Sequence, residues 1–113
     1  MSDELLSVEV LDRGSDQVVS VSGELDFGTT AGFLDVVQPL AAAGRPVVLD
    51  LADLAFCDSS GLGAFVRLHK LSQEAGGALY LARLRPQLES TITVTMLHRL
   101  LLIRDDVPAA DPE

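Results

Sequence analysis

Two serines and a carboxylate stand together where a strand is expected to give way to a helix. Asp58, Ser59 and Ser60 are followed by Gly61 and by apolar residues at helical spacing. The first N–H groups of a helix have no partner within it, so this position suits a side-chain cap or a phosphate group. Any of the three side chains could cap the helix, and either serine hydroxyl could accept a phosphoryl group.

Nucleophilic catalysis by one of these serines would require a neighbouring base. The chain has two histidines and lacks the Gly-x-Ser-x-Gly motif of hydrolases. His69 lies on the helix that the serines begin, about 15 Å along its axis from Ser59, which is too far. His98 belongs to another element and is more typical of a surface or cap position. We therefore interpret the chain as a substrate of catalysis and not as an enzyme, with a small hydrolase as the weakest alternative.

The composition is typical of one soluble globular domain, with 113 residues, 48% hydrophobic and 22% charged. Eight basic and seventeen acidic side chains give a net charge of −9, and such a surface repels nucleic acid. No apolar run approaches the roughly 20 residues of a membrane helix, and no signal peptide is recognisable. We expect a cytoplasmic protein that acts on another protein, without membrane insertion or direct contact with nucleic acid.

The single cysteine, Cys57, excludes an internal disulfide and a cysteine cluster for a metal. Its place before Asp58 favours a small buried hydrophobic residue over a redox sensor. We expect neither a metal nor a cofactor. Residues 107–113 contain two prolines and two acids, so we expect a single domain of residues 1–106 followed by a disordered acidic tail.

The predicted elements alternate between strands and helices, which indicates an α/β domain. Residues 7–11 and 17–22 flank the turn signal Gly14-Ser15-Asp16 and should form a hairpin, so the sheet is mixed. Beyond the hairpin we expect a helix capped by Thr29 and then a buried strand at 47–51 that leads toward the serines. The next helix should span about residues 60–75, with Ser59 projecting as its cap. A buried strand at 78–82, a helix from Pro86 and a short strand at 100–103 should follow.

The helix after the serines has an apolar face and a charged face. Its sheet-facing stripe recurs at spacings of three and four residues, and it consists of Ala64, Phe65, Leu68, Leu71 and Ala75. Leu62 and Val66 lie outside this stripe, on the same side as Ser59. They are either partly exposed beside the serine, where a partner could dock, or packed at the edge of the core.

The order of motifs resembles the STAS domain, and specifically the small single-domain anti-sigma factor antagonists of bacteria. The resemblance spans about residues 8–103, and it is carried by Gly23-Glu24-Leu25-Asp26, Thr29, residues 47–51, residues 58–63 and Gly76-Gly77. It implies a single STAS-like domain of α/β class, with a small mixed sheet, an N-terminal hairpin and helices packed mainly on one side.

The resemblance also implies a function. In that family the first serine of the Asp-Ser-Ser-Gly run is phosphorylated, which by position is Ser59, by a partner that is both anti-sigma factor and serine kinase of the ATP-binding type. The unphosphorylated protein binds this partner and frees a sigma factor, and a phosphoserine phosphatase reverses the modification. The helix start is expected to accommodate the phosphate without unfolding. The partner-binding residues expected here are Asp26, Asp58, Ser60, Leu62 and Val66.

The alternative function is a STAS scaffold or subunit of a larger assembly, such as a membrane transport system, without phosphorylation. The chain also matches the metal-binding tripeptide of kinases at Asp26-Phe27-Gly28. We interpret this match as accidental, because 113 residues are too few for a kinase.

The C-terminal third departs from the family pattern. The third helix of the family usually ends in a Gly-Leu pair, whereas this chain has Met96-Leu97. The preceding residues 91–95 are rich in β-branched side chains, which have poor helix propensity. This helix is therefore either weak or held mainly by tertiary packing.

Overall fold

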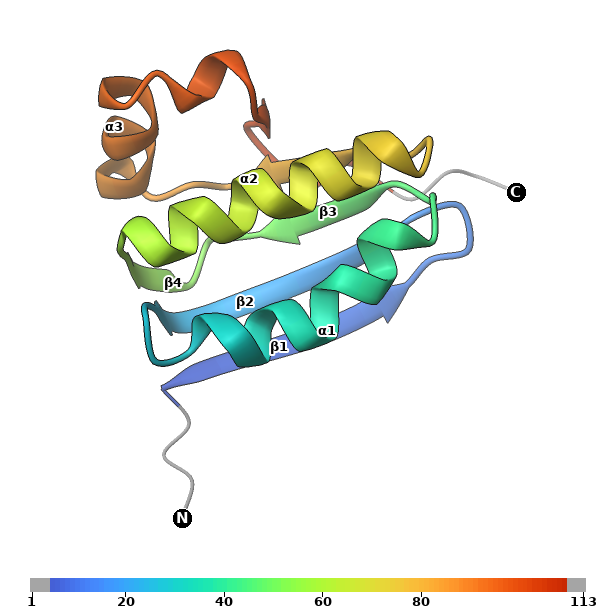
Figure 1. The fold of residues 1–113 in the computed structure, drawn as a ribbon, viewed down its shortest axis with the longest axis horizontal. Helices are drawn as coiled ribbons and strands as arrows, with labels where there is room; N and C mark the ends of the chain where they lie inside the picture. Colours follow the sequence, from blue (N-terminus) through green and yellow to red (C-terminus); the bar gives the residue numbers. More distant parts are fainter. Residues whose placement is uncertain (1–4, 110–113) are drawn as a thin grey trace.

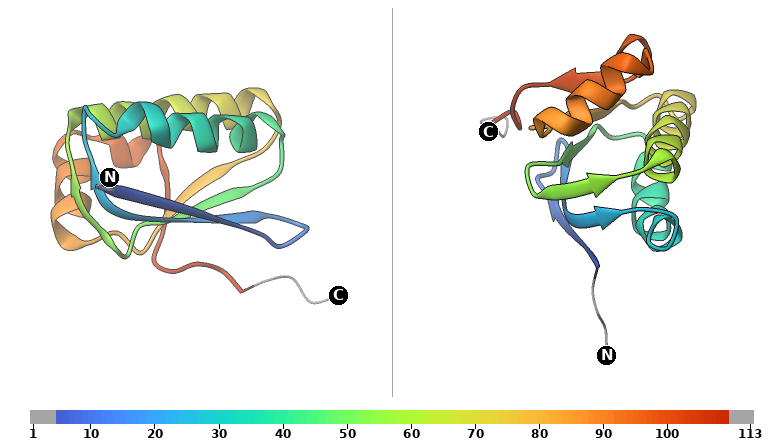
Figure 2. Two further views of the ribbon diagram at one scale, coloured as in Figure 1. Left: turned by 90° about the horizontal axis from the view of Figure 1, so that it is seen from below. Right: turned by 90° about the vertical axis from the view of Figure 1, so that its left-hand side faces the viewer.

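A computed structural model describes residues 5–109, which form a six-stranded mixed sheet with helices α1 and α2 on one face (Figures 1 and 2). The strand order is β1-β2-β3-β5-β6, and β4 pairs with β2 beyond the end of β3. In chain order the elements are β1 (Leu6–Asp12), β2 (Gln17–Leu25), α1 (Thr30–Ala42), β3 (Val47–Asp50), β4 (Leu54–Cys57), α2 (Ser59–Glu74), β5 (Leu79–Ala82), α3 (Pro86–Val94), the 3-10 helix η1 (Leu97–Arg99) and β6 (Leu102–Arg104). This arrangement confirms the predicted fold class.

The N-terminal hairpin is confirmed. Strands β1 and β2 are antiparallel over the whole of β1, from the pair Leu6 and Gly23 to the pair Asp12 and Gln17. Every other strand pair in the described residues is parallel. Since parallel strands end at the same edge of a sheet, β2 and β4 deliver the loop before α1 and the start of α2 to neighbouring positions.

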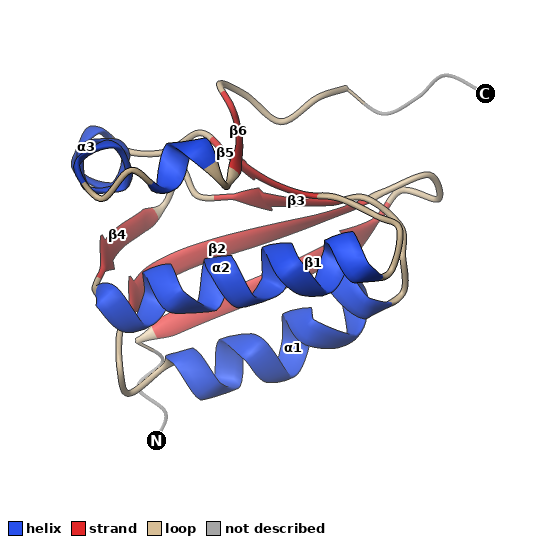
Figure 3. Cartoon of the chain, turned by 45° about the horizontal axis from the view of Figure 1, so that its top comes forward, coloured by secondary structure: helices blue, strands red, loops and turns tan. Residues whose placement is uncertain are grey.

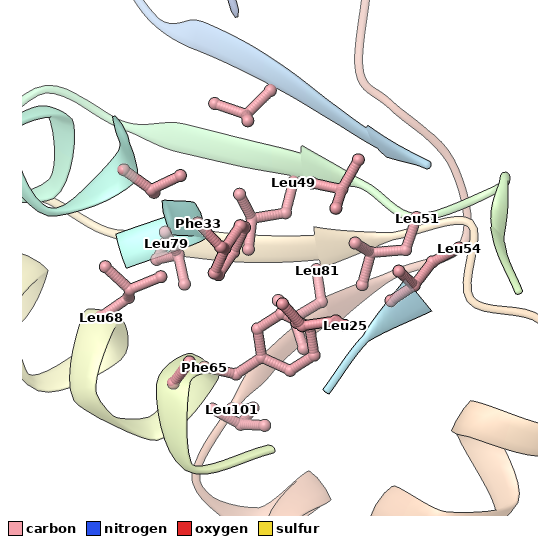
Figure 4. Close-up of a cluster of buried hydrophobic side chains, with 14 of the residues drawn as sticks. Leu25, Phe33, Leu49, Leu51, Leu54, Phe65, Leu68, Leu79, Leu81 and Leu101 are labelled. Carbon is pink, nitrogen blue, oxygen red and sulfur yellow. The ribbon is translucent and has the colours of Figure 1, made fainter. Parts of the chain in front are cut away.

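The main core lies between the sheet and the helices α1 and α2 (Figure 4). Phe33 of α1 and Phe65 of α2 meet edge to face there, with ring centroids 6.1 Å apart. Most of the predicted stripe of α2 is buried or half-buried, but Ala75 is exposed because the helix ends at Glu74. The polar residues His69 and Ser72 are buried instead.

The segment leading to the serines differs from the prediction of one buried strand. It contains two short strands, β3 and β4, separated by a turn in which the Leu54 N–H donates to the Leu51 carbonyl at 3.1 Å. Strand β3 is buried as expected, whereas Ala55 and Phe56 of β4 are exposed. The prediction was wrong here because β4 has a neighbouring strand on one side only, and α3 stands on its other side (Figure 3).

The third helix forms despite its β-branched residues. Leu88 and Ile92 are buried in the main core, while the hydroxyls of Thr91 and Thr93 donate to carbonyls four residues earlier at 3.0 Å. Tertiary packing therefore holds this helix, which is the second of the two predicted alternatives. It is followed by Met96 in the left-handed conformation, with φ 65°.

The other face of the sheet carries a smaller cluster made by Val18, Val48 and Ala82. Tyr80 packs against this cluster, and the Arg104 guanidinium lies 4.2 Å from the centroid of its ring. Val107 is half-buried against the same cluster. The expected disordered tail therefore needs correction at its first residue, whereas residues 110–113 lie outside the described part of the chain. Between residues 5 and 109, no helix is both long and apolar enough to cross a membrane.

Candidate phosphoacceptor site

Asp58 caps helix α2. Its backbone is extended, and its Oδ1 accepts the N–H groups of Ser60 at 2.8 Å and Gly61 at 3.2 Å. The helix therefore begins at Ser59, one residue before the predicted start, and neither serine is the cap. Of the alternatives left open by the sequence, the structure selects the carboxylate.

Gly61 is required by close packing in the first turn of α2. A Cβ at this position would lie 2.6 Å from the Cys57 Sγ and 3.0 Å from side-chain atoms of Leu25. These neighbours belong to the ends of β4 and β2. The glycine therefore allows the start of the helix to lie directly on the two strands that lead to the site.

The loop between β2 and α1 is held beside the same helix start. The Phe27 N–H donates to Oδ2 of Asp58 at 3.2 Å. Within the loop, Asp26 Oδ1 accepts the N–H groups of Gly28 at 2.9 Å and Thr29 at 3.1 Å. Thr29 Oγ1 accepts the Asp26 N–H at 2.9 Å and donates to the Glu24 carbonyl at 2.8 Å. The predicted Thr29 cap is thus the residue before α1, but its hydroxyl braces the loop instead of the helix.

The side chains around this helix start differ in accessibility. Ser59 is exposed and Ser60 is half-buried. The neighbouring Phe27 is 86% exposed, which is exceptional for an aromatic side chain. Phe27 belongs to the kinase-like tripeptide Asp26-Phe27-Gly28, and the sequence signal for its exposure is its place between Asp and Gly in a turn.

Of the two alternatives for the side chains beside Ser59, partial exposure fits Val66, which is half-buried, and packing against the core fits Leu62. Leu62 is only 8% exposed and belongs to the main core. The same cluster contains Leu88 and Ile92 of α3 and Leu101 after η1. The C-terminal segment therefore covers the side of α2 on which Leu62 lies.

The site is negatively charged. Glu24, Asp26 and Asp58 surround the loop and the helix start, and no ion pair within residues 5–109 reaches any of them. The Asp58 charge is stabilised by three backbone N–H groups instead.

Cys57 lies half-buried beneath the site. Burial, followed by the neighbouring charge of Asp58, raises the pKa of the Cys57 thiol to about 12. The thiol is therefore protonated at neutral pH and is a poor nucleophile. This agrees with the interpretation of Cys57 as a packing residue.

Neither histidine is placed to activate a serine. His69 is buried on α2 with its Nδ1 unpartnered, and His98 is exposed on η1. In the described residues, no side chain makes a hydrogen bond with the hydroxyl of Ser59 or Ser60. The Ser59 hydroxyl is thus exposed, with no side-chain hydrogen bond inside the part of the chain that the structure describes.

A groove of about 220 Å³ opens next to the site, between β4 and α3. Phe56 and Cys57 line one wall, and Arg85, Gln87 and Thr91 are on the other. The sequence did not predict this groove because it depends on where α3 stands relative to β4.

Comparison with known proteins agrees with the geometry. The family model of the STAS domain matches residues 7–110 of the chain. The chain is 30% identical over 96 residues to the anti-sigma-B factor antagonist of Bacillus subtilis. The aligned residues cover 85% of this chain and 88% of that protein.

Solved structures show the same fold. An anti-sigma factor antagonist from Mycobacterium paratuberculosis superimposes with a TM-score of 0.78 at 24% identity, covering 94% of this chain and 91% of that one. The Bacillus cell fate determinant SpoIIAA in its phosphorylated form gives a TM-score of 0.66 at 19% identity, covering 88% and 91% of the two chains.

Proposed function

The chain belongs to the STAS domain family, among the anti-sigma factor antagonists, and on that premise we propose that it is a partner switch controlled by phosphorylation of Ser59. The unphosphorylated chain binds an anti-sigma factor that is also an ATP-dependent serine kinase, which frees a sigma factor. The phosphorylated chain lets this partner go, and a phosphoserine phosphatase restores it. The observation that carries the proposal is the exposed Ser59 hydroxyl in the first turn of α2, next to the capping Asp58.

The transfer itself requires little from this chain. The Ser59 oxygen attacks the γ-phosphorus of ATP, the bond from that phosphorus to the ADP oxygen breaks, and the hydroxyl proton passes to a base. No base within the described residues contacts the hydroxyl, so the kinase supplies it. The rigid helix start presents the serine in one position, which is the contribution of Asp58 and of the close packing at Gly61.

The effect of the phosphate follows from the way α2 is capped. A phosphate adds about −1.5 to −2 charges at neutral pH. The start of α2 can stabilise this charge only to a limited extent, because the Ser60 and Gly61 N–H groups already donate to Asp58. The phosphate would therefore remain an exposed charge beside Asp58 and Asp26. Burying it against an unmatched partner surface costs several kcal/mol, whereas leaving it in water does not unfold the domain.

The docking surface proposed here surrounds Ser59. Phe27 is its anchor, because a protruding aromatic side chain can fill a pocket on a partner at little conformational cost. Asp26 and Asp58 hold the loop that carries Phe27, and Ser60 and Val66 flank the phosphoacceptor. Leu62 supports this surface from the core instead of contacting the partner directly.

The test is phosphorylation of matched variants by the kinase-type anti-sigma factors of the same organism, with labelled ATP. We expect wild type and Ser60→Ala to be labelled, and Ser59→Ala to remain unlabelled while still binding the kinase. Ser59→Asp should bind more weakly than Ser59→Ala. Labelling of Ser59→Ala together with loss of labelling in Ser60→Ala would move the switch to Ser60.

The phosphorylation state of the protein in its native cells distinguishes the scaffold function from the switch. Mass spectrometry of the chain purified from its native cells should find phosphate on Ser59. If the wild-type chain carries no phosphate there and no such kinase labels it, the scaffold or transport-assembly function is favoured instead.

A further inference from the structure

Strand β1 is an edge strand with little protection against pairing beyond the carboxylates of Glu9 and Asp12. It pairs with β2 along one side, and its other side meets no strand of the described chain (Figure 1). Proteins often protect such edges with proline, lysine or a bulge. Residues 6–12 contain neither residue, and their register with β2 is unbroken.

The free edge also exposes large apolar side chains. Leu5 is 55% exposed, Val10 43% and Leu11 61%. Leu6 and Val8 are half-buried and pack against the core on the helix-covered side of the sheet. Leu5, Ser7, Glu9 and Leu11 alternate with them and therefore point to the other face.

The hydrogen bonds of the hairpin show which backbone groups point outward. The Glu24 N–H donates to the Leu5 carbonyl at 2.8 Å, and the Arg13 N–H donates to the Asp16 carbonyl at 2.9 Å. Hydrogen-bonded and non-hydrogen-bonded positions alternate along an antiparallel strand. The odd-numbered residues of β1 thus bond to β2, whereas Leu6, Val8 and Val10 direct their N–H and C=O groups to the free edge.

We propose that β1 pairs with β1 of a second copy of this chain, antiparallel and centred on Val8. This register brings the outward-facing groups of Val8 opposite each other and those of Leu6 opposite Val10, so they can exchange hydrogen bonds. Two symmetric copies then share one continuous sheet.

The side chains favour this register over the one centred on Glu9. Centred on Val8, the exposed Leu5 and Leu11 of opposite copies meet on one face, and Ser7 stands opposite Glu9. A register centred on Glu9 also satisfies the backbone, but it places Glu9 opposite Glu9 and Leu6 opposite Asp12. Like charges directly opposite destabilise a strand pair.

The proposed dimer is independent of the proposed switch. Strand β2 separates β1 from β4, whose end leads to Ser59, so the second copy does not pair with the strand that carries the phosphoacceptor. Phosphorylation and dimerisation can therefore be measured and can fail separately.

Sedimentation analysis over a range of concentrations tests the pairing. We expect wild type to dimerise, Ser7→Lys to tighten the dimer roughly fivefold by two new Lys–Glu pairs, and Ser7→Glu to weaken it by a similar factor. Ser90→Lys, an equal charge change on the exposed side of α3, should leave the dimer unchanged. Thermal melts establish that each variant is folded. A wild type that stays monomeric at all concentrations, or Ser7 variants that leave the dimer unaffected, would overturn the proposal.

Disulfide trapping tests the register in a Cys57→Ser background. Residues 7 and 9 of opposite copies form a non-hydrogen-bonded pair, with Cα atoms about 4.5 Å apart, which a disulfide can bridge. A mixture of Ser7→Cys and Glu9→Cys chains should cross-link on oxidation as a heterodimer. Efficient cross-linking of Glu9→Cys alone would place the centre at Glu9 and overturn the proposed register.

Discussion

The Phe27 N–H donates to the Asp58 carboxylate at 3.2 Å, across 31 positions of the chain. The other oxygen of the same carboxylate caps α2. One side chain therefore fixes both the start of the helix that carries Ser59 and the loop that presents Phe27. This carboxylate directly links the loop of the proposed anchor to the helix that carries the phosphoacceptor.

The first prediction concerns the two functions of Asp58. Asp58→Ala removes the cap and the loop contact, and we expect a loss of unfolding free energy of about 0.5–2 kcal/mol. Asp58→Asn keeps one acceptor oxygen for the cap, so it should be less destabilised while still weakening partner binding. Chemical denaturation and a binding titration measure the two effects. Asp53→Ala, an exposed carboxylate on the turn before β4, is the control for the lost charge.

The second prediction is that Phe27→Ala weakens partner binding by about 2 kcal/mol or more without changing stability. The side chain is almost fully exposed, so its removal leaves no cavity. Calorimetric titration with the kinase measures the binding, and a thermal melt measures the stability. Val94→Ala, another exposed apolar residue, should change neither. An equal loss of binding in both variants would show that Phe27 is not an anchor.

The third prediction separates Leu62 from Val66. Leu62→Ala should lower the unfolding free energy by about 2–5 kcal/mol, as expected for a leucine in the core. Val66→Ala should cost less stability but weaken binding by about 1 kcal/mol or more, because Val66 flanks the proposed phosphoacceptor. Measurements of unfolding and of binding on both variants decide the assignment. A Leu62→Ala variant of normal stability that binds poorly would restore Leu62 to the docking surface.

Local patterns predicted most of the fold. The hairpin, the apolar stripe of α2 and the short buried strand β5 each follow from the periodicity of a few neighbouring residues. The capping Asp58 was among the candidates for the same reason, since cap preferences are local. These features hardly depend on the rest of the chain.

The features that sequence reasoning missed depend on contacts between distant segments. The burial of Leu62 requires the segment from α3 to Leu101 to complete the core over α2. The exposure of β4 requires α3 to stand where another strand could have paired. The exposure of Phe27 contradicts the usual preference of aromatic residues for the core, and its place between Asp26 and Gly28 was the one local signal for it.

The fourth prediction concerns acid stability. Arg45 donates to Asp12 at 2.8 Å, and this bond, more than the hydrogen bond from Gly14, lowers the pKa of Asp12 from 3.8 to about 2. Because the folded pKa is below its unfolded value, the stabilisation is present above about pH 4 and is lost as the pH falls toward 2. Arg45→Gln should flatten this part of the dependence of unfolding free energy on pH. Arg67→Gln, which removes an arginine without an acidic partner in the described residues, should retain it.

The fifth prediction uses the departure of this chain from its family at the end of α3. Met96 adopts φ 65° and ψ 13°, a left-handed conformation in which glycine is unstrained and other residues are not. This geometry suits the glycine that the resemblance to the family leads us to expect at this position. Because the Met96 side chain is 48% exposed, little packing is lost when it is removed.

Met96→Gly should therefore raise the unfolding free energy by about 0.5–1 kcal/mol, after the greater flexibility of glycine in the unfolded chain is subtracted. Thr95→Gly is the matched control, since Thr95 has φ −85° and gains nothing from a glycine. The control should be destabilised, also because the Thr95 hydroxyl donates to the Thr91 carbonyl at 2.8 Å. Denaturant titrations of the two variants and the wild type measure the difference. Equal destabilisation by both glycines would mean that the end of α3 does not hold Met96 in the left-handed conformation in solution.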